Sequence, residues 1–188
     1  ALLFFYFFGF LTGKDFIFTP GQFINIKVGE NTYRSYSLCS SVNEIPRISL
    51  AVDVHHEGPG SSYLKNLAIS DTVEFIGPSG KMGLPENLTN ESLYFIATGT
   101  GVSPFISILH SLLRKGYKGK IKVFFGVRCE KDFYFTDRMD FFTDSFISFN
   151  YKLCVSQPET PDAVSSRVTN DLGTLTDRKA YYFLCGHP

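Results

Sequence analysis

The chain has 188 residues and a mass of 21.1 kDa, a length that suits one large domain or two small ones. Apolar residues make up 44% of it, which argues against disorder and provides for a buried core. Its 18 basic residues balance its 18 acidic residues, so a nucleic-acid-binding protein, whose domains carry a basic excess, is disfavoured. A polybasic membrane patch is disfavoured as well, because Lys and Arg form no run.

The four cysteines, at positions 39, 129, 154 and 185, are too far apart in sequence for a CxxC pair. A domain of this size needs no disulfide, so we expect reduced thiols and a cytoplasmic protein. The spacing also argues against an iron–sulfur cluster held within this chain. His55 and His56 are neighbours that would point to opposite faces of a strand, so no metal site is predicted.

The two ends of the chain are both apolar. Residues 1–11 are too short for a membrane span and lack the features of a signal peptide, so we interpret them as a buried strand. A remnant of a membrane segment is the alternative, because the chain starts at Ala1 rather than Met. The last residues stop directly after a strand-like run, so we expect a helix to follow and the chain to be incomplete at its C-terminus.

Residues 1–86 are expected to form an antiparallel β-barrel or sandwich. Turn-forming residues recur every 8 to 14 positions, with short β-rich runs between them at residues 16–18, 22–28, 33–39, 47–54 and 71–77. One helix is predicted here, over residues 61–68, with Ser61 or Ser62 as its N-cap.

Residues 91–188 are expected to form an α/β domain. Continuous apolar runs, at residues 93–98, 120–127, 151–156 and 181–186, are typical of strands covered on both faces. Residues 104–116 have helical spacing and end at Gly116, and residues 135–144 and 165–172 form helical or loop segments between later strands. Strands that alternate with crossovers predict a parallel sheet.

The segment TGTGVSP, residues 98–104, joins a predicted strand to a predicted helix. Gly99 and Gly101 allow a tight turn and a close approach of a ligand, and Pro104 suits the first helical turn. Free N–H groups at such a helix start favour a phosphate. A purely structural turn is the alternative, since Pro104 stands where the third glycine of GxGxxG would fall.

On a strand, Arg34 and Tyr36 share one face, and Ser35 and Ser37 share the other. An arginine beside a tyrosine offers a guanidinium group that can pair with a phosphate and a flat aromatic ring that can pack against a ligand. An exposed Arg among ordinary strand residues is the alternative. The segment GPGSSYL, residues 58–64, is a glycine-rich turn that leads into a short helix. It is either a second site whose backbone N–H groups could bind an anion or a plain turn.

Six segments together, RSYS, GPGSSYL, IGPSGKMGL, ATGTGVSP, FFGVR and LCGHP, occur in an order and spacing that resembles the ferredoxin–NADP reductase superfamily. The resemblance covers residues 20–188. It implies a flavin-binding antiparallel β-barrel at residues 1–86 and an NAD(P)-binding α/β domain at residues 91–188. It also implies an oxidoreductase that passes hydride from NAD(P)H to a bound flavin, and electrons onward to a protein or small-molecule acceptor.

The resemblance places Arg34 on a flavin phosphate, Tyr36 against the isoalloxazine ring and Ser37 near its reactive N5 atom. Gly58 and Ser61 match a Gly-x-x-Ser turn whose backbone amides would neutralise the phosphate. The expected flavin-binding residues lie in two segments, residues 34–37 and 54–62: Arg34, Ser35, Tyr36, Ser37, Val54, Gly58, Gly60, Ser61 and Ser62.

For the nicotinamide nucleotide, the resemblance implies Thr100 and Gly101 near the dinucleotide, with Cys185 and Gly186 beside the nicotinamide. Ser37 and Cys185 would flank the hydride transfer as catalytic residues, although a plain buried cysteine is the alternative for position 185. Arg128 would contact the adenosine or its 2′-phosphate. Gln157 stands where NADPH-selective members often have Arg, so both NADH and NADPH remain open.

FAD is favoured over FMN as the flavin, because a Gly-x-x-Ser turn that leads into a helix suits a diphosphate. The acceptor, for example ferredoxin, flavodoxin or an oxygenase component, is not specified by the sequence, and the isolated chain is expected to contact neither nucleic acid nor membrane. Three alternatives are left open: a non-catalytic regulatory or electron-transfer subunit of a larger complex, the reductase part of a membrane-bound oxidase or ferric reductase, and a two-domain protein without a cofactor.

Overall fold

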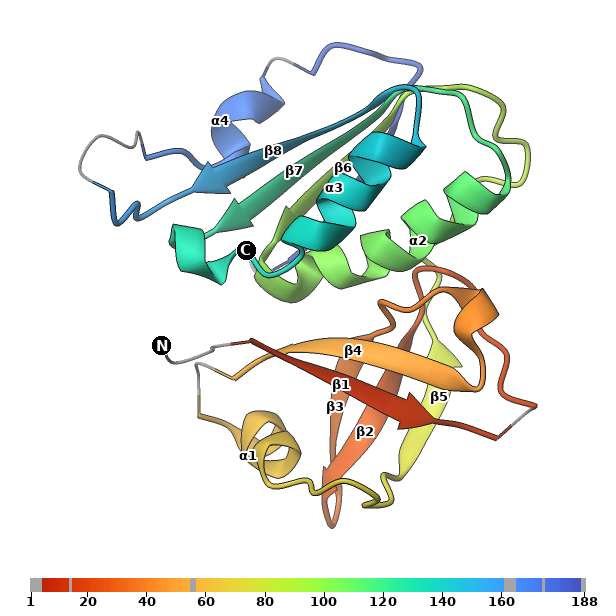
Figure 1. Cartoon of the computed structure of the whole chain (residues 1–188), viewed down its shortest axis with the longest axis vertical. Helices are drawn as coiled ribbons and strands as arrows, with labels where there is room; N and C mark the ends of the chain where they lie inside the picture. Colours follow the sequence, from red (N-terminus) through yellow and green to blue (C-terminus); the bar gives the residue numbers. More distant parts are fainter. Residues whose placement is uncertain (1–4, 14, 55–56, 161–164, 174, 187–188) are drawn as a thin grey trace. The chain divides into compact units, whose positions relative to one another are not determined.

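The computed structural model describes residues 5–13, 15–54, 57–160, 165–173 and 175–186. By the density of internal contacts the chain divides into two units, residues 1–83 with 103–111 and residues 84–102 with 112–188. Figure 1 draws the strands of the first unit in red to yellow and the parallel sheet of the second in green to blue. No helix in the part of the chain that the structure describes has the length and apolar character needed to cross a membrane.

The first unit is built from antiparallel strands. Strand β1 (Phe5–Leu11) pairs with β4 (Arg47–Asp53), and β2 (Phe23–Gly29) lies between β3 (Thr32–Ser37) and β5 (Phe75–Ser79). An antiparallel bridge from Leu38 to Leu50 joins β3 to β4, and a short 3₁₀ turn (Val42–Glu44) lies between these two strands in the chain. The predicted antiparallel β architecture is confirmed.

The core of this unit shows how the strands and helix α1 (Pro59–Lys65) depend on one another. Side chains from β2, β4 and α1 meet in one cluster, because alternate strand residues point inward and α1 contributes Leu64. The buried members of the cluster are Phe18, Ile24, Ile26, Leu38, Ile48, Leu50, Val52, Val54 and Leu64. The apolar alternation of the sequence therefore encodes this core.

One strand prediction in this unit is wrong, and a second is correct for the strand but only in part for its burial. Residues 16–18 form no strand, because the Phe16 N–H closes a turn to the Gly13 carbonyl (3.1 Å) and Phe18 packs into the core. Strand β1 forms as expected and packs Phe8 and Phe10 against the core, whereas Phe7 is 53% and Leu11 is 81% exposed, because only one face of its sheet is covered.

Two boundaries also differ. Helix α1 begins at Pro59 with Gly58 as its N-cap, not at Ser61 or Ser62, because a proline suits the first helical position. Strand β5 begins at Phe75 rather than at residue 71, because the Asp71 N–H donates to the Ala68 carbonyl at 3.2 Å and closes a turn there.

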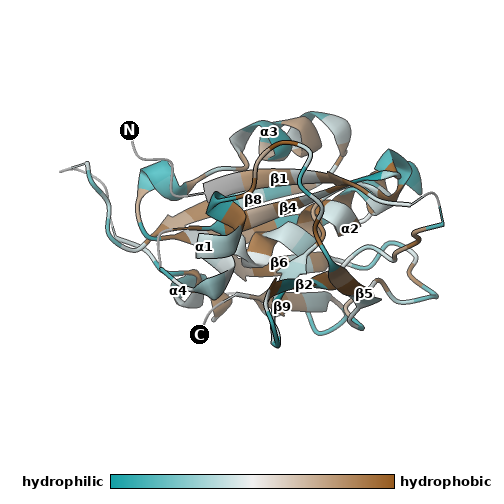
Figure 2. Ribbon diagram, turned by 90° about the horizontal axis from the view of Figure 1, so that it is seen from below, coloured by the Kyte–Doolittle hydropathy of each residue, from teal (hydrophilic) through white to brown (hydrophobic). Residues whose placement is uncertain are grey.

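The second unit contains a parallel sheet in the order β8-β7-β6-β9. Its strands are β6 (Leu93–Thr98), β7 (Ile121–Val127), β8 (Phe149–Val155) and β9 (Tyr181–Cys185). They coincide within two residues with the apolar runs of the sequence, and the predicted α/β class is confirmed. In Figure 2 the strands carry much of the hydrophobic colour, as expected for covered strands.

The crossovers of this sheet contain the remaining helices. A 3₁₀ turn (Gly99–Val102) leads from β6 into α2 (Ser103–Arg114), and a second one (Glu130–Asp132) precedes α3 (Thr136–Ser145); α4 (Val168–Leu172) precedes β9. On one face of the sheet Tyr94 and Phe124 pack against Val168 of α4. Their neighbours Phe95 and Phe125 point to the opposite face, on the side of α3 (Figure 1).

Candidate functional site

Strand β3 presents the Arg-x-Tyr-Ser segment of the first unit. Its register with β2 sets Ser35 opposite Asn25, and the Ser35 hydroxyl donates to Asn25 Oδ1 at 2.7 Å. Because strand side chains alternate, Arg34 and Tyr36 point to the other face, as the sequence predicted. Ser37 ends the strand and is half-buried.

Helix α1 places Gly60 directly on the face that carries Arg34 and Tyr36. A Cβ atom built on Gly60 would overlap the Tyr36 hydroxyl and would lie 3.2 Å from Arg34 Cγ. Only a residue without a side chain fits this approach without displacing the tyrosine. The structure thus brings together the RSYS and GPGSSYL segments.

The electrostatics of this face favour an anionic ligand. Arg34 is exposed and donates through Nη1 to the Tyr33 carbonyl at 2.8 Å, and no carboxylate among the described residues forms an ion pair with it. Burial raises the pKa of the Tyr36 hydroxyl above its ordinary value of 10.0, an effect that the nearby Arg34 charge opposes. At neutral pH the face therefore combines a cation with a neutral aromatic ring.

The other expected flavin-binding residues lie in the turn before α1. Gly58 is extended and its carbonyl accepts both the Ser61 hydroxyl (3.4 Å) and the Ser62 N–H (2.9 Å). Ser61 is half-buried and Ser62 is exposed. The Val54 side chain is buried in the core, so only the backbone of this residue is available to a ligand.

In the second unit, the TGTG and CG segments meet at the carboxyl ends of β6 and β9. A Cβ on Gly101 would lie 2.5 Å from the carbonyl carbon of Cys185 and 2.6 Å from Gly186 Cα. Gly186 has a φ of +148°, and a Cβ there would lie 2.8 Å from the Thr98 nitrogen. The two glycines are therefore required by close backbone packing. Ligands of parallel sheets bind at this edge.

Cys185 and Thr100 flank these glycines. Cys185 ends β9, pairs with Ala97 of β6 and is half-buried. Burial raises the pKa of its thiol above the ordinary value of 9.0, while a hydrogen bond from the Gly186 backbone lowers it. The thiol is therefore protonated at neutral pH. Thr100 lies half-buried in the 3₁₀ turn.

Arg128 follows β7, and its side chain is held by a carboxylate that the sequence analysis did not single out. Its Nε lies 3.8 Å from Oδ2 of Asp132, whose side chain is 7% exposed. The same oxygen accepts the backbone N–H of Cys129 at 3.3 Å and its thiol at 3.2 Å. The Arg-x-x-x-Asp spacing at the end of a strand was the available sequence signal.

The Gln157 N–H donates to the Arg128 carbonyl at 2.7 Å, so the ends of β7 and β8 are joined.

His55 and His56 lie outside the described residues. Among the residues that are described, no group of three or more His, Cys, Asp or Glu side chains is arranged to hold a metal ion.

Two family models match the chain. Residues 7–83 match the oxidoreductase FAD-binding domain, and residues 95–188 match the oxidoreductase NAD-binding domain. The first match contains Arg34, Tyr36 and Gly60, and the second contains Gly101 and Cys185. The chain belongs to the ferredoxin–NADP reductase superfamily.

Named members of the superfamily resemble the chain over most of its length. It is 34% identical to ferredoxin–NADP reductase B of Sorangium cellulosum over 148 residues, 77% of this chain and 60% of that protein. It is 30% identical to the toluate 1,2-dioxygenase electron transfer component of Pseudomonas putida over 175 residues, 91% of this chain and 51% of the relative. The chain thus spans about half of the length of the curated relatives that it matches.

A solved structure agrees with this assignment. The crystal structure of a mutant ferredoxin–NADP⁺ reductase from Plasmodium falciparum superposes with a TM-score of 0.85 at 27% identity, covering 97% of this chain and 77% of that one. The superfamily expected from the six motifs is confirmed, and FAD and NAD are confirmed as the cofactors named by its domain models. The roles of individual residues stay predictions.

The residues present fit the cofactors of the superfamily. On the first unit, the Arg34 cation and the neutral Tyr36 ring suit a phosphate and a flat ring system. On the second, Gly101 and Gly186 let the turn after β6 pack directly against the end of β9, at the carboxyl edge of the sheet where nucleotides bind.

Proposed function

We propose that the chain forms the flavin- and nicotinamide-binding core of an NAD(P)H-dependent oxidoreductase. It accepts hydride from the nucleotide and passes electrons onward to a protein or small-molecule acceptor. The observation that carries this proposal is the packing of Gly60 against Arg34 and Tyr36, in a segment that matches an FAD-binding domain and precedes an NAD-binding domain.

In this proposal residues 1–86 bind FAD. Arg34 pairs with a flavin phosphate through charge-assisted hydrogen bonds, and Tyr36 packs its neutral ring against the flavin. Ser37, at the end of β3, lies beside the reactive edge of the ring. Once bound, the flavin supplies a two-electron acceptor that can release its electrons singly, and the protein contributes placement and electrostatics.

Residues 91–188 bind the nicotinamide nucleotide. The nucleotide is held at the carboxyl ends of β6 and β9 by Thr100, Gly101 and Gly186. At these ends the close packing of Gly101 against Gly186 brings the turn after β6 next to the end of β9. Cys185 contacts the nicotinamide as a neutral thiol, so it helps to exclude water without adding a charge. Arg128, oriented by Asp132, contacts the adenosine end.

The acceptor proposed is a ferredoxin or an oxygenase component, in line with the names of the relatives, ferredoxin–NADP reductase B and toluate 1,2-dioxygenase electron transfer component. A reducing compartment, the cytoplasm, is proposed for the protein because all four cysteines are free thiols.

The test is the visible spectrum of the purified chain. We expect flavin absorbance that bleaches on anaerobic addition of NADH or NADPH, and heat-released flavin that co-elutes with FAD. Reduction of an artificial dye by the isolated chain distinguishes a working reductase from a module that transfers electrons only within a complex. A colourless protein that binds neither added FAD nor added FMN would refute the proposal.

A further inference from the structure

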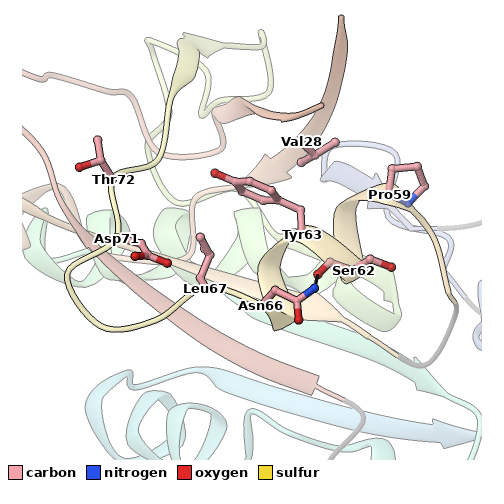
Figure 3. Close-up of a pocket in the computed structure, with 8 residues that line it drawn as sticks. All are labelled: Val28, Pro59, Ser62, Tyr63, Asn66, Leu67, Asp71 and Thr72. Carbon is pink, nitrogen blue, oxygen red and sulfur yellow. Dashed lines mark hydrogen bonds between the residues drawn. The ribbon is translucent and has the colours of Figure 1, made fainter. Parts of the chain in front are cut away.

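The second unit carries the charges that meet the adenosine end of the nicotinamide nucleotide, because the proposed function places that end beside Arg128. NADH and NADPH differ only there, in a phosphate that NADPH carries on the adenosine 2′-oxygen. The pocket beside helix α1 of the first unit (Figure 3) lies within the match to the FAD-binding domain, so it is not expected to contact this phosphate. The charges around Arg128 therefore determine which nucleotide is the better donor.

Two loops, one after β7 and one after β8, are held together around Arg128. The Gln157 N–H binds the Arg128 carbonyl, and Glu130 of the first loop binds the second loop through both of its carboxylate oxygens. Its Oε2 accepts the Glu159 N–H at 2.9 Å, and its Oε1 accepts the Thr160 hydroxyl at 2.8 Å. These hydrogen bonds hold the pKa of Glu130 below its ordinary value, so its charge is present at neutral pH.

The two cations of the first loop each lie beside a carboxylate. Arg128 Nε lies 3.8 Å from Oδ2 of the buried Asp132. Lys131 forms an ion pair with Glu159, whose side chain is 54% exposed, and the hydrogen bond of this pair raises the pKa of Lys131 above its ordinary value. A phosphate that approaches either cation would therefore have to compete with a carboxylate that is already there.

The beginning of α4 adds one more cation at this edge. Arg167 is the N-cap of α4 and lies near the end of β8, because the N–H of the preceding Ser166 donates to the Val155 carbonyl at 2.7 Å. Within residues 128–135, 156–160 and 165–167, which the structure describes, cations and carboxylates are equal in number. The cations are Arg128, Lys131 and Arg167, and the carboxylates are Glu130, Asp132 and Glu159.

This balance matters because the two nucleotides need different surroundings. A phosphate monoester carries nearly two negative charges at neutral pH, so it requires an excess of positive charge, which these segments do not provide. A free 2′-hydroxyl is uncharged and requires a hydrogen-bond acceptor, which a carboxylate provides. The charges at this edge of the sheet therefore favour the nucleotide without the phosphate.

We propose that the chain uses NADH in preference to NADPH, and that Glu159 is the residue that sets this preference. Of the three carboxylates Glu159 is the most exposed, since Asp132 is buried and Glu130 is half-buried. It neutralises Lys131, repels a 2′-phosphate and offers an acceptor to a ribose hydroxyl. This inference rests on the proposed function, which places the adenosine end of the nucleotide beside Arg128.

The first measurement is of binding, by calorimetric titration of the flavin-loaded chain with AMP and with 2′-phospho-AMP. The wild type is expected to bind AMP at least as tightly as 2′-phospho-AMP. Glu159→Gln removes the repelling charge and releases Lys131, so the affinity for 2′-phospho-AMP should rise by about 5-fold. The affinity for AMP should change by less than about 2-fold, because glutamine keeps an oxygen acceptor. Glu159→Lys should raise the affinity for 2′-phospho-AMP further.

The second measurement is of kcat/KM for each nucleotide in the reduction of an artificial dye. We expect the wild type to favour NADH by at least ~10-fold, and Glu159→Gln to reduce this preference by about 5-fold through a lower KM for NADPH. Glu86→Gln is the matched control, because it removes the same charge from an exposed residue of the second unit that precedes β6. It should change neither the preference nor the binding of 2′-phospho-AMP.

Two results would overturn the preference and leave the proposed function intact. One is a wild type that uses NADPH as well as NADH or better. The other is a pair of Glu159 variants, shown to be folded by circular dichroism, in which the affinities for AMP and 2′-phospho-AMP change alike or not at all. A flavin-loaded chain that neither nucleotide reduces would overturn the proposed function itself.

Discussion

Gly60 packs so closely against Tyr36 that a methyl group at position 60 would overlap the tyrosine hydroxyl. Helix propensity does not account for a glycine here, because glycine in a helix costs about 1 kcal/mol relative to alanine. The close contact does. Helix α1 therefore limits the position of the tyrosine ring from one side, although it follows Tyr36 in the chain only after the whole of β4.

The first prediction concerns Gly60→Ala. The overlapping atom is the end of a side chain, so Tyr36 can move away and the free energy of unfolding should change by less than about 1 kcal/mol. The displaced ring no longer packs against the flavin, so FAD affinity should fall by about 10-fold. Flavin titration and thermal unfolding measure the two effects. The control is Gly13→Ala, where an added Cβ has no atom within 4 Å. Unchanged FAD affinity in Gly60→Ala would argue against the role of Tyr36.

The second prediction, for Gly101→Ala, differs because the obstructing atoms belong to the backbone of Cys185 and Gly186. Backbone at the end of a parallel strand cannot move freely, so we expect a loss of about 1–3 kcal/mol in the free energy of unfolding. The KM for the nicotinamide nucleotide should also rise, while flavin content stays normal. Gly173→Ala, where an added Cβ meets no atom within 4 Å, is the control. Equal stability and KM in both variants would contradict the packing argument.

The sequence predicted the parts of the fold that depend on local patterns. Continuous apolar runs identified the parallel strands to within two residues, and the positions of Gly99, Gly101 and Pro104 identified the turn between β6 and α2. These features depend on neighbours in the chain, so their residue types are sufficient. The strand predicted at residues 16–18 is wrong for the opposite reason. A strand needs a partner strand, and a local pattern does not show whether one is present.

The site was predicted as a set of motifs, but its contacts were not. Nothing in the spacing shows that Gly60 touches Tyr36 or that Gly101 touches Cys185, because both contacts join segments that lie far apart in the chain and meet only through tertiary packing. Asp132 was missed because an aspartate on a short turn is usually exposed. Its burial becomes visible only in three dimensions.

Arg34→Ala should reduce FAD affinity by about 10- to 100-fold, which corresponds to the loss of one charge-assisted hydrogen-bonding group. The guanidinium has no carboxylate partner among the described residues, so its removal should leave the stability of the flavin-free chain nearly unchanged. Flavin retention during gel filtration and a thermal melt report both quantities. Arg47→Ala, an exposed arginine on β4, should retain its flavin. Tight FAD binding by Arg34→Ala would exclude the phosphate role.

Cys185→Ala should slow the anaerobic bleaching of the flavin by NADH or NADPH without releasing the flavin. Burial raises the thiol pKa above 9.0, so the neutral thiol is the species present from about pH 6 to 8. The wild-type bleaching rate should therefore show no titration by this group in that range. A thiolate forms, and the rate changes, only as the pH rises through the raised pKa. Stopped-flow traces across pH measure this, and a bleaching rate in Cys185→Ala equal to that of the wild type would remove the catalytic role.

Selectivity between NADH and NADPH should respond to position 157. The hydrogen bond from the Gln157 N–H to the Arg128 carbonyl holds the two residues side by side at the ends of β8 and β7. Gln157→Arg sets a second guanidinium beside the first, and two cations can pair with a 2′-phosphate that NADH lacks. We expect the ratio of kcat/KM for NADPH to that for NADH to rise by about 10-fold. Gln157→Glu should lower the ratio, since a carboxylate repels the phosphate. If both variants shift the ratio in the same direction, the adenosine end of the nucleotide does not bind beside Arg128.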